Sequence, residues 1–169
     1  MNKIIYIIPG LGENCKLVRY KKLARVLQEK GYKVNLINPN WYRPLSEQVF
    51  HIEKEAIILG FSFGAVLAYL IVEKYPCEKA IFASISPLHT LSSKGLIEDY
   101  MKHMSKELAI EITKDIKSIK ISFKDLKTPF ITLAGELEVQ SVKKMANLLV
   151  PKTGHFITNN YISCIEKSL

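Results

Sequence analysis

The sequence predicts a single α/β domain over residues 1–169, with a doubly wound, mainly parallel sheet of about six strands. Short runs rich in Ile, Val and Leu recur without polar alternation, which is typical of parallel strands covered on both faces. Segments with helical apolar spacing separate these runs. The contents of hydrophobic residues (48%) and charged residues (24%) are ordinary for a globular chain and speak against disorder.

Six apolar runs are the predicted strands, and they cover residues 3–8, 33–37, 56–59, 79–83, 130–134 and 148–150. The apolar spacing of residues 17–30 predicts an amphipathic helix. It should end at Gly31, because glycine is frequent at helix C-termini. Residues 63–75 are apolar nearly all round and stop at Pro76, so we expect a helix buried against the sheet.

The connection over residues 88–128 is longer than the others. Its apolar stripe predicts one amphipathic helix through Ile97, Met101, Met104, Leu108, Ile112 and Ile116. Such a stripe normally faces the core, and the alternative is a small lid. We therefore expect a minimal cap or none.

The net charge of +8 comes mostly from scattered lysines, a pattern typical of a solvated surface and not of a nucleic-acid site. At long range it favours an anionic substrate or an acidic carrier protein. The spacing of Cys15, Cys77 and Cys164 indicates reduced thiols and no zinc site. Cys15 is expected to be buried; a reactive thiol is the alternative.

The apolar run near the N-terminus is too short to span a membrane and is not followed by a cleavage site for a signal peptide. We therefore expect a cytoplasmic protein.

The pentapeptide Gly60-Phe61-Ser62-Phe63-Gly64 has the pattern G-x-S-x-G, which arises by chance in about 6% of chains of this length. Here it joins a predicted strand to a predicted helix, as a nucleophile elbow does. Gly60 and Gly64 would leave room for the sharp turn, and Ser62 would project above the sheet edge. The alternative is a tight turn without catalytic function.

A serine nucleophile needs a base and a carboxylate that orients the base. His155 follows the last predicted strand, at the sheet edge where Ser62 is expected. Glu136 and Glu138 follow the fifth strand at this edge. The two glutamates are two residues apart, and we expect only one of them to reach His155.

These features resemble the α/β-hydrolase superfamily. Residues 135–138, Gly-Glu-Leu-Glu, are similar to its G-x-x-D/E turn, which selects Glu138 as the acid, although Asp is the more frequent residue there. The order Ser62, Glu138, His155 is the superfamily's order. Residues 8–14 resemble its oxyanion loop, which implies that the backbone N–H groups of Leu11 and Phe63 bind the oxyanion.

In that loop Pro9 replaces the usual His, so the loop must be braced differently. The short chain resembles compact members of the superfamily, such as carboxylesterases and the serine hydrolases related to retinoblastoma-binding protein 9.

The resemblance implies hydrolysis of a carboxylic ester or thioester through an acyl-enzyme on Ser62, with no metal or cofactor. The substrate would be a small molecule or an acyl group on a carrier protein, such as a pimeloyl methyl ester. The alternative is a catalytically inactive binding protein with an acidic macromolecular partner.

Overall fold

The computed structural model describes residues 3–169, whose strands form one six-stranded sheet. In chain order the strands are β1 Ile4–Ile8, β2 Lys33–Leu36, β3 Ile57–Phe61, β4 Lys79–Ala83, β5 Phe130–Gly135 and β6 Leu148–Val150. They lie in the order β2-β1-β3-β4-β5-β6, and every neighbouring pair is parallel. The predicted fold class and strand count are confirmed.

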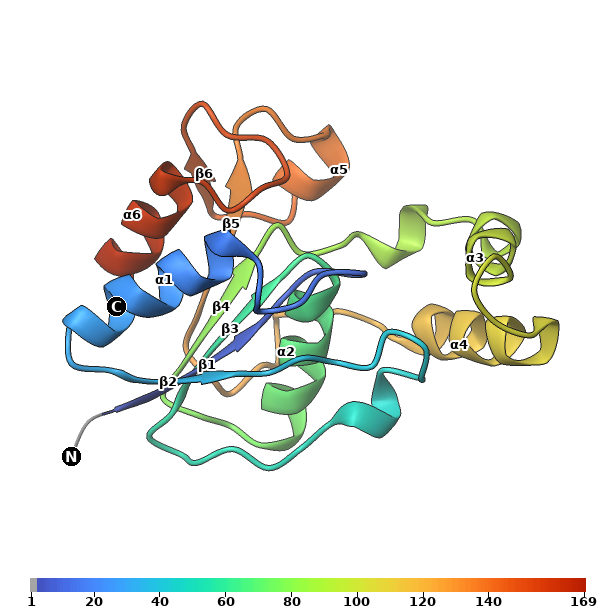
Figure 1. Ribbon diagram of the computed structural model, residues 1–169, viewed down its shortest axis with the longest axis horizontal. Coiled ribbons are helices and arrows are strands. Elements are labelled where there is room, and N and C mark those ends of the chain that lie inside the picture. Colours follow the sequence, from blue (N-terminus) through green and yellow to red (C-terminus); the bar gives the residue numbers. More distant parts are fainter. Residues whose placement is uncertain (1–2) are drawn as a thin grey trace.

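Helices cover both faces of the sheet (Figure 1). Helices α1 (Val18–Glu29) and α6 (Asn159–Lys167) pack on one face, and α2 (Phe63–Lys74) packs on the other. The central strand β3 is buried at all five positions. This two-sided burial is the physical reason why the strand sequences are apolar without alternation.

The order of the strands reverses between β1 and β3. From β1 the chain moves outward to β2, and it then crosses back to place β3 on the other side of β1, with Ile8 paired to Gly60. The loops after β1 and β3 therefore leave the same edge side by side. In open α/β sheets this switch point is where ligands bind.

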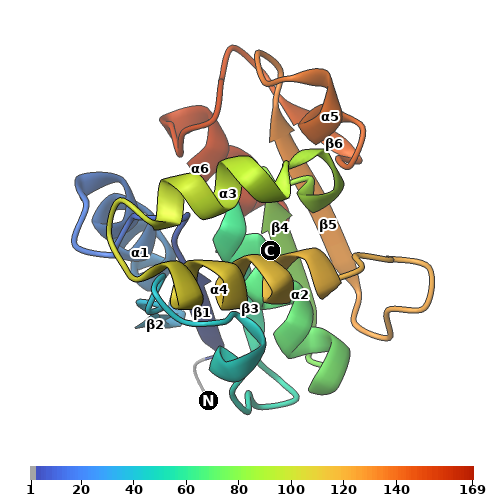
Figure 2. The ribbon, with the colours of Figure 1, turned by 90° about the vertical axis from the view of Figure 1, so that its right-hand side faces the viewer.

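The segment between β4 and β5 contains two helices, α3 (Ser93–Tyr100) and α4 (Lys106–Ser118). The prediction of one continuous helix through Ile97 and Ile116 is wrong. The hydroxyl of Ser105 accepts a hydrogen bond from the N–H of Leu108 (3.3 Å) and begins a new helix, because an N-cap serine satisfies an otherwise unpaired N–H group. Figure 2 shows the two helices side by side.

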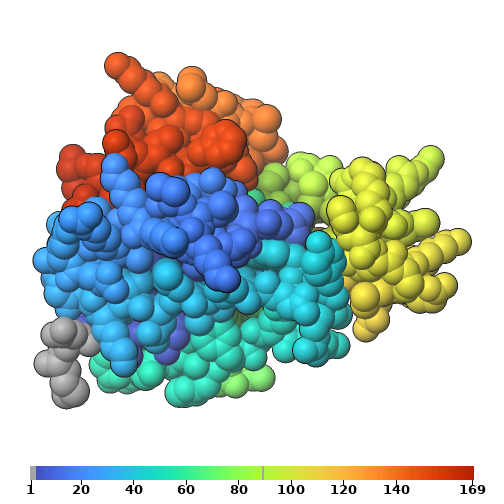
Figure 3. All heavy atoms as spheres, in the orientation of Figure 1, coloured from blue at the N-terminus to red at the C-terminus, as the bar shows by residue number. Residues whose placement is uncertain are grey.

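Helix α4 is joined to the body of the protein by charged side chains. The Asp115 carboxylate accepts hydrogen bonds from the N–H groups of Leu45 (2.6 Å) and Ser46 (3.3 Å), just before and at the start of the short 3₁₀ helix η1 (Ser46–Gln48). Lys117 donates to the carbonyl oxygen of Leu88 (3.2 Å), in the 3₁₀ helix η2 (Leu88–Thr90). Helices α3 and α4 form a small cap, which Figure 3 shows in yellow beside the cyan segment that contains η1.

The remaining helix is the short α5 (Gln140–Lys143), between β5 and β6. Across residues 3–169, no helix is both long enough and apolar enough to cross a membrane.

Replacing Gly60 with alanine should destabilise the fold. A Cβ atom at Gly60 would lie 2.2 Å from the carbonyl oxygen of Gly64 and 2.5 Å from the Cα of Ala65, both in backbone that cannot rotate away. We expect the free energy of unfolding to fall by about 3 kcal/mol, measured by urea denaturation. Gly154→Ala is the control, since a Cβ atom there would meet nothing within 4 Å. Equal stability of the two variants would contradict this packing argument.

Candidate active site

Ser62 lies at the turn between β3 and α2 in a strained backbone conformation. Its φ of 55° and ψ of −119° are unusual for a residue with a side chain, and its N–H donates to the carbonyl of Ala83 at 2.9 Å. The turn places Ser62 directly before the first residue of α2. The positive end of the helix dipole therefore faces the serine.

Close backbone contacts explain both glycines of the pentapeptide. A Cβ atom on Gly64 would lie 2.1 Å from the carbonyl oxygen of Pro9, in the loop after β1. At Gly60 the obstacle is the backbone of α2 itself. Only glycine allows β1, β3 and α2 to approach this closely, and the approach brings the loop after β1 next to Ser62.

A chain of hydrogen bonds links Ser62, His155 and Glu138. His155 Nε2 lies 3.0 Å from Ser62 Oγ, and His155 Nδ1 lies 2.7 Å from Glu138 Oε2. An ionised carboxylate only accepts hydrogen bonds, so Nδ1 carries the proton and Nε2 is left as an acceptor for the serine hydroxyl. This arrangement can remove a proton from Ser62.

The Glu138 carboxylate is buried, with 2% of its side chain exposed, and it has further donors. Its Oε1 accepts from the N–H of Gly135 (2.7 Å), from the hydroxyl of Ser84, and from the hydroxyl of Tyr161 (3.3 Å). A buried charge is tolerated when its hydrogen bonds are satisfied in this way.

These donors also keep Glu138 ionised. Burial alone would raise its pKa, but the hydrogen bonds from His155, Ser84 and Gly135 outweigh burial and hold the pKa of Glu138 below its usual value. The carboxylate is therefore charged at neutral pH, as a group that orients His155 and stabilises its protonated form must be.

Glu136, the other candidate acid, points elsewhere. It is exposed, and its Oε2 accepts from the N–H of Lys152 at 2.9 Å. Cys15 is buried, and burial raises the pKa of its thiol to about 11. A thiolate nucleophile at Cys15 is thus disfavoured.

Three supporting residues were not identified from the sequence. Ser84 follows β4 with a φ of 49°, and Tyr161 lies on α6, far from Glu138 in the chain. The ring of Phe61 packs against His155, with ring centroids 5.0 Å apart. The position of Ser84 directly after a predicted strand is a signal in the sequence. The sequence holds no comparable signal for Tyr161.

The loop after β1 lies close to Ser62. A Cβ atom on Gly10 would lie 3.3 Å from the Cβ of Ser62, and Leu11 is the next residue. Among hydrogen bonds between described residues, none uses the N–H groups of Leu11 or Phe63. Both N–H groups are therefore unpaired within the described part of the protein.

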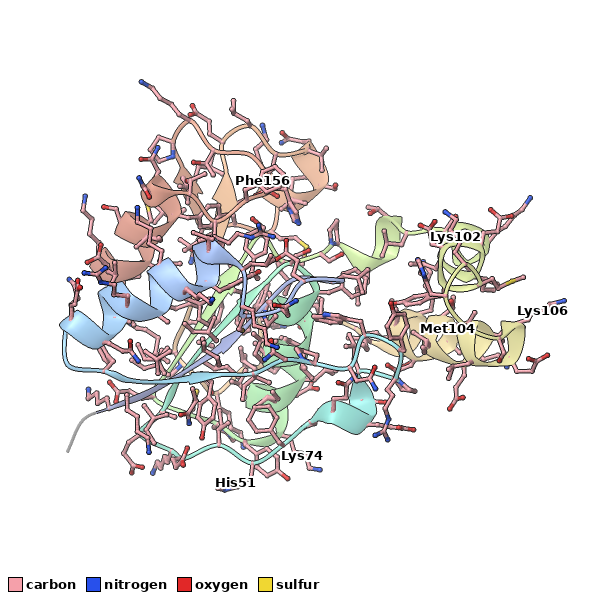
Figure 4. All side chains as sticks on the ribbon, viewed as in Figure 1. His51, Lys74, Lys102, Met104, Lys106 and Phe156 are labelled. Carbon is pink, nitrogen blue, oxygen red and sulfur yellow. The ribbon has the colours of Figure 1, made fainter. Side chains whose placement is uncertain are left out.

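A groove of about 520 Å³ begins at this loop and extends under the cap. Its apolar and aromatic lining comes from the loop after β1, from residues 39–42 and from α3: Leu11, Pro39, Trp41, Tyr42, Leu96 and Tyr100. Polar side chains, including those of Lys102 and His103, complete its wall at the cap end. Figure 4 labels Lys102, with Met104 and Lys106, at the projecting end of the cap.

The groove is large enough for a small organic ligand. In the part of the chain that the structure describes, no three His, Cys, Asp or Glu side chains are grouped as metal ligands.

Solved structures with the α/β-hydrolase fold match this chain over almost its whole length. An α/β-hydrolase enzyme from a sediment metagenome of the Mar Chica lagoon, Morocco, is 18% identical with a TM-score of 0.66, and the match covers 99% of this chain and 89% of that one. The monoacylglycerol lipase of Paleococcus ferrophilus is 13% identical with a TM-score of 0.65, and the match covers 98% of this chain and 93% of that one. A thioesterase domain from the curacin biosynthetic pathway is 13% identical with a TM-score of 0.59, and the match covers 99% of this chain and 90% of that one.

No protein-family model and no curated protein matches the sequence. At these identities the structural matches establish the fold. The chain has the α/β-hydrolase fold, as its motifs predict.

Replacing Glu138 with glutamine should distinguish it from Glu136. Glu138→Gln keeps the size of the side chain but removes the charge that holds the Nδ1 proton of His155, so we expect kcat to fall by about 10³-fold or more. Glu136→Gln should stay within about twofold of the wild type, because surface substitutions usually have small effects. Turnover of a short p-nitrophenyl ester measures both, and a larger loss for Glu136→Gln would reverse the assignment.

Proposed function

We propose that this protein hydrolyses a carboxylic ester or thioester through an acyl-enzyme on Ser62. The hydrogen-bonded chain Ser62–His155–Glu138, with the serine at a strained turn, is the observation that carries the proposal. The solved structures with this fold include a monoacylglycerol lipase and a thioesterase domain, which supports chemistry of the same class.

In the first half-reaction, Nε2 of His155 accepts the proton of Ser62 as Oγ bonds to the carbonyl carbon. The carbonyl oxygen becomes an oxyanion, and the N–H groups of Leu11 and Phe63 donate to it. Protonated His155 then gives its proton to the leaving alcohol or thiol, whose bond to carbon breaks. The acyl group stays on Ser62 as an ester.

In the second half-reaction, His155 takes a proton from water, and the hydroxide bonds to the acyl carbon. The bond to Ser62 Oγ breaks, and His155 returns the proton to the serine. The products are a carboxylic acid and the free enzyme. His155 is well placed for this step because about half of its side chain is exposed.

The groove beside Leu11 is the place for one arm of the substrate. Its aromatic and aliphatic lining fits an apolar acyl or alkyl group. An acyl group on an acidic carrier protein is one substrate of this class. The net charge of +8 would attract such a carrier, most strongly at low salt.

A fluorophosphonate probe tests the nucleophile directly. The wild type should become labelled at Ser62, because the probe reacts with an activated serine, and Ser62→Ala should remain unlabelled. Heat-denatured wild type is the control, since it retains the serine but loses the arrangement with His155. Mass spectrometry reads the adduct; an unlabelled wild type, or equal labelling of Ser62→Ala, would refute the proposal.

The inactive-binding alternative gives a different result in the same experiment. A binding protein would neither be labelled nor turn over short esters. The intact hydrogen-bonded chain at Ser62 gives no support to that alternative.

Narrowing the groove should change the preference for acyl length. Leu96 lies on α3 and lines the groove, so Leu96→Trp should lower kcat/KM for long-chain p-nitrophenyl esters by about tenfold and leave the acetyl ester nearly unchanged. Leu149→Trp, on the exposed side of β6, is the matched control. Equal losses for short and long esters would exclude this groove as the acyl site.

A further inference from the structure

We propose that Tyr20 and Glu13 are positioning residues that hold the loop after β1 in place for oxyanion binding. This loop, residues 9–13, is called the oxyanion loop below. The inference rests on the proposed function, and it concerns a buried tyrosine and a partly buried glutamate that take no part in the chain of hydrogen bonds from Ser62 to Glu138.

Tyr20 and Glu13 form a closed ring of hydrogen bonds with the loop. The N–H of Gly10 donates to the hydroxyl of Tyr20 at 3.0 Å, and that hydroxyl donates to the Glu13 carboxylate. The N–H of Glu13 in turn donates to the carbonyl of Gly10 at 3.0 Å. The ring restrains the backbone on both sides of Leu11, whose N–H is the proposed oxyanion donor.

The ring is attached to rigid parts of the fold. Tyr20 is fully buried on α1, within the core between that helix and the sheet. Glu13 also accepts from the guanidinium of Arg19 on the same helix, which compensates its charge. The oxyanion loop is thereby fixed to α1, a helix that lies outside the cap and on the opposite face of the sheet from α2.

A further contact connects the ring to the groove. The indole N–H of Trp41 donates to the backbone carbonyl of Glu13 at 3.0 Å, and Trp41 lines the groove. The same residue therefore joins the oxyanion loop to the wall that would receive the substrate. A substrate that contacts Trp41 would therefore contact a residue bonded to the restrained oxyanion loop.

The hydroxyl of Tyr20 can act as a donor over the whole working pH range. Burial, together with the hydrogen bond to Glu13, raises the pKa of Tyr20 far above its usual value. The phenol stays protonated, so the bond to Glu13 persists while its oxygen accepts from Gly10.

Small displacements of the loop would matter for catalysis. Gly10 is close to Ser62, so a shift of the loop changes the distance between the Leu11 donor and an oxyanion on Ser62. Donors help the transition state only when they already point at the developing charge. Pro9 offers no side-chain donor to brace the loop, and the Tyr20–Glu13 pair supplies the bracing from α1.

The test compares Tyr20→Phe with Tyr69→Phe in the full-length protein. Tyr69 is also buried and makes similar contacts: the N–H of Ser122 donates to its hydroxyl at 3.1 Å, and the hydroxyl lies 3.1 Å from the carbonyl oxygen of Ser122 and 3.2 Å from Glu73 Oε1. It lies on α2 with its hydroxyl away from the oxyanion loop. Each variant therefore loses one tyrosine hydroxyl that contacts a backbone N–H and a carboxylate, and only the Tyr20 hydroxyl touches the loop.

We expect Tyr20→Phe to lower kcat for a short p-nitrophenyl ester by about tenfold or more, with KM changed by less than about twofold. The affinity for an alkyl boronic acid, which forms a tetrahedral adduct on Ser62, should fall by the same factor as kcat/KM, because both report transition-state stabilisation. Tyr69→Phe should show a similar loss of thermal stability and a kcat within about twofold of the wild type.

Glu13→Gln is the second variant and keeps the size of the acceptor. It removes the charge that pairs with Arg19 but keeps an oxygen that can accept from the Tyr20 hydroxyl, so it should lower kcat less than Tyr20→Phe does. Glu13 also lines the groove, so kcat for the short ester is the measure here. If Tyr20→Phe does not fold, this variant decides the question on the same kinetic measurements.

The outcomes separate the two proposals. A wild type that is labelled and active, with Tyr20→Phe no slower than Tyr69→Phe, overturns the positioning role and leaves the proposed function standing. A wild type that is neither labelled nor active overturns both.

Discussion

The close backbone contact between the end of β1 and the start of α2 is the constraint on which the site depends. Gly64 lies so near the carbonyl oxygen of Pro9 that no side chain fits between them, and Gly60 meets α2 in the same way. These contacts force the turn at Ser62 and bring the loop after β1 beside it. Because β1 and β3 flank the switch point of the sheet, the strained turn is supported by paired strands on both sides.

The other half of the site depends on a buried charge. Glu138 orients His155 only while it is ionised, and a buried carboxylate stays ionised only when donors surround it. Gly135, Ser84 and Tyr161 supply those donors from three different parts of the chain. The last strands and α6 are therefore as necessary to the geometry as the elbow, although they carry no part of the G-x-S-x-G pattern.

Much of this architecture was predictable because local patterns encode it. Parallel strands covered on both faces are apolar throughout, and this pattern located all six. The sequence motifs also pointed to the groups that the structure brings together at Ser62. The small size of the cap agrees with the prediction, but the prediction of one continuous helix was wrong, because the apolar stripe of one long helix is also compatible with two helices whose apolar faces meet the core. Ser105, the N-cap residue that begins α4 after α3, accepts a hydrogen bond from the N–H of Leu108.

The sequence by itself determined the fold class, the strand order along the chain, the elbow at Ser62 and the pair of glutamates from which one acid had to come. The resemblance to α/β hydrolases favoured Glu138, and the tertiary structure brings this glutamate to His155 because the turn after β5 folds against the loop after β6. It also decided how a loop with Pro9 is braced. Tyr20 and Glu13 are seven residues apart, and only the packing of α1 against the sheet brings the tyrosine hydroxyl to the N–H of Gly10.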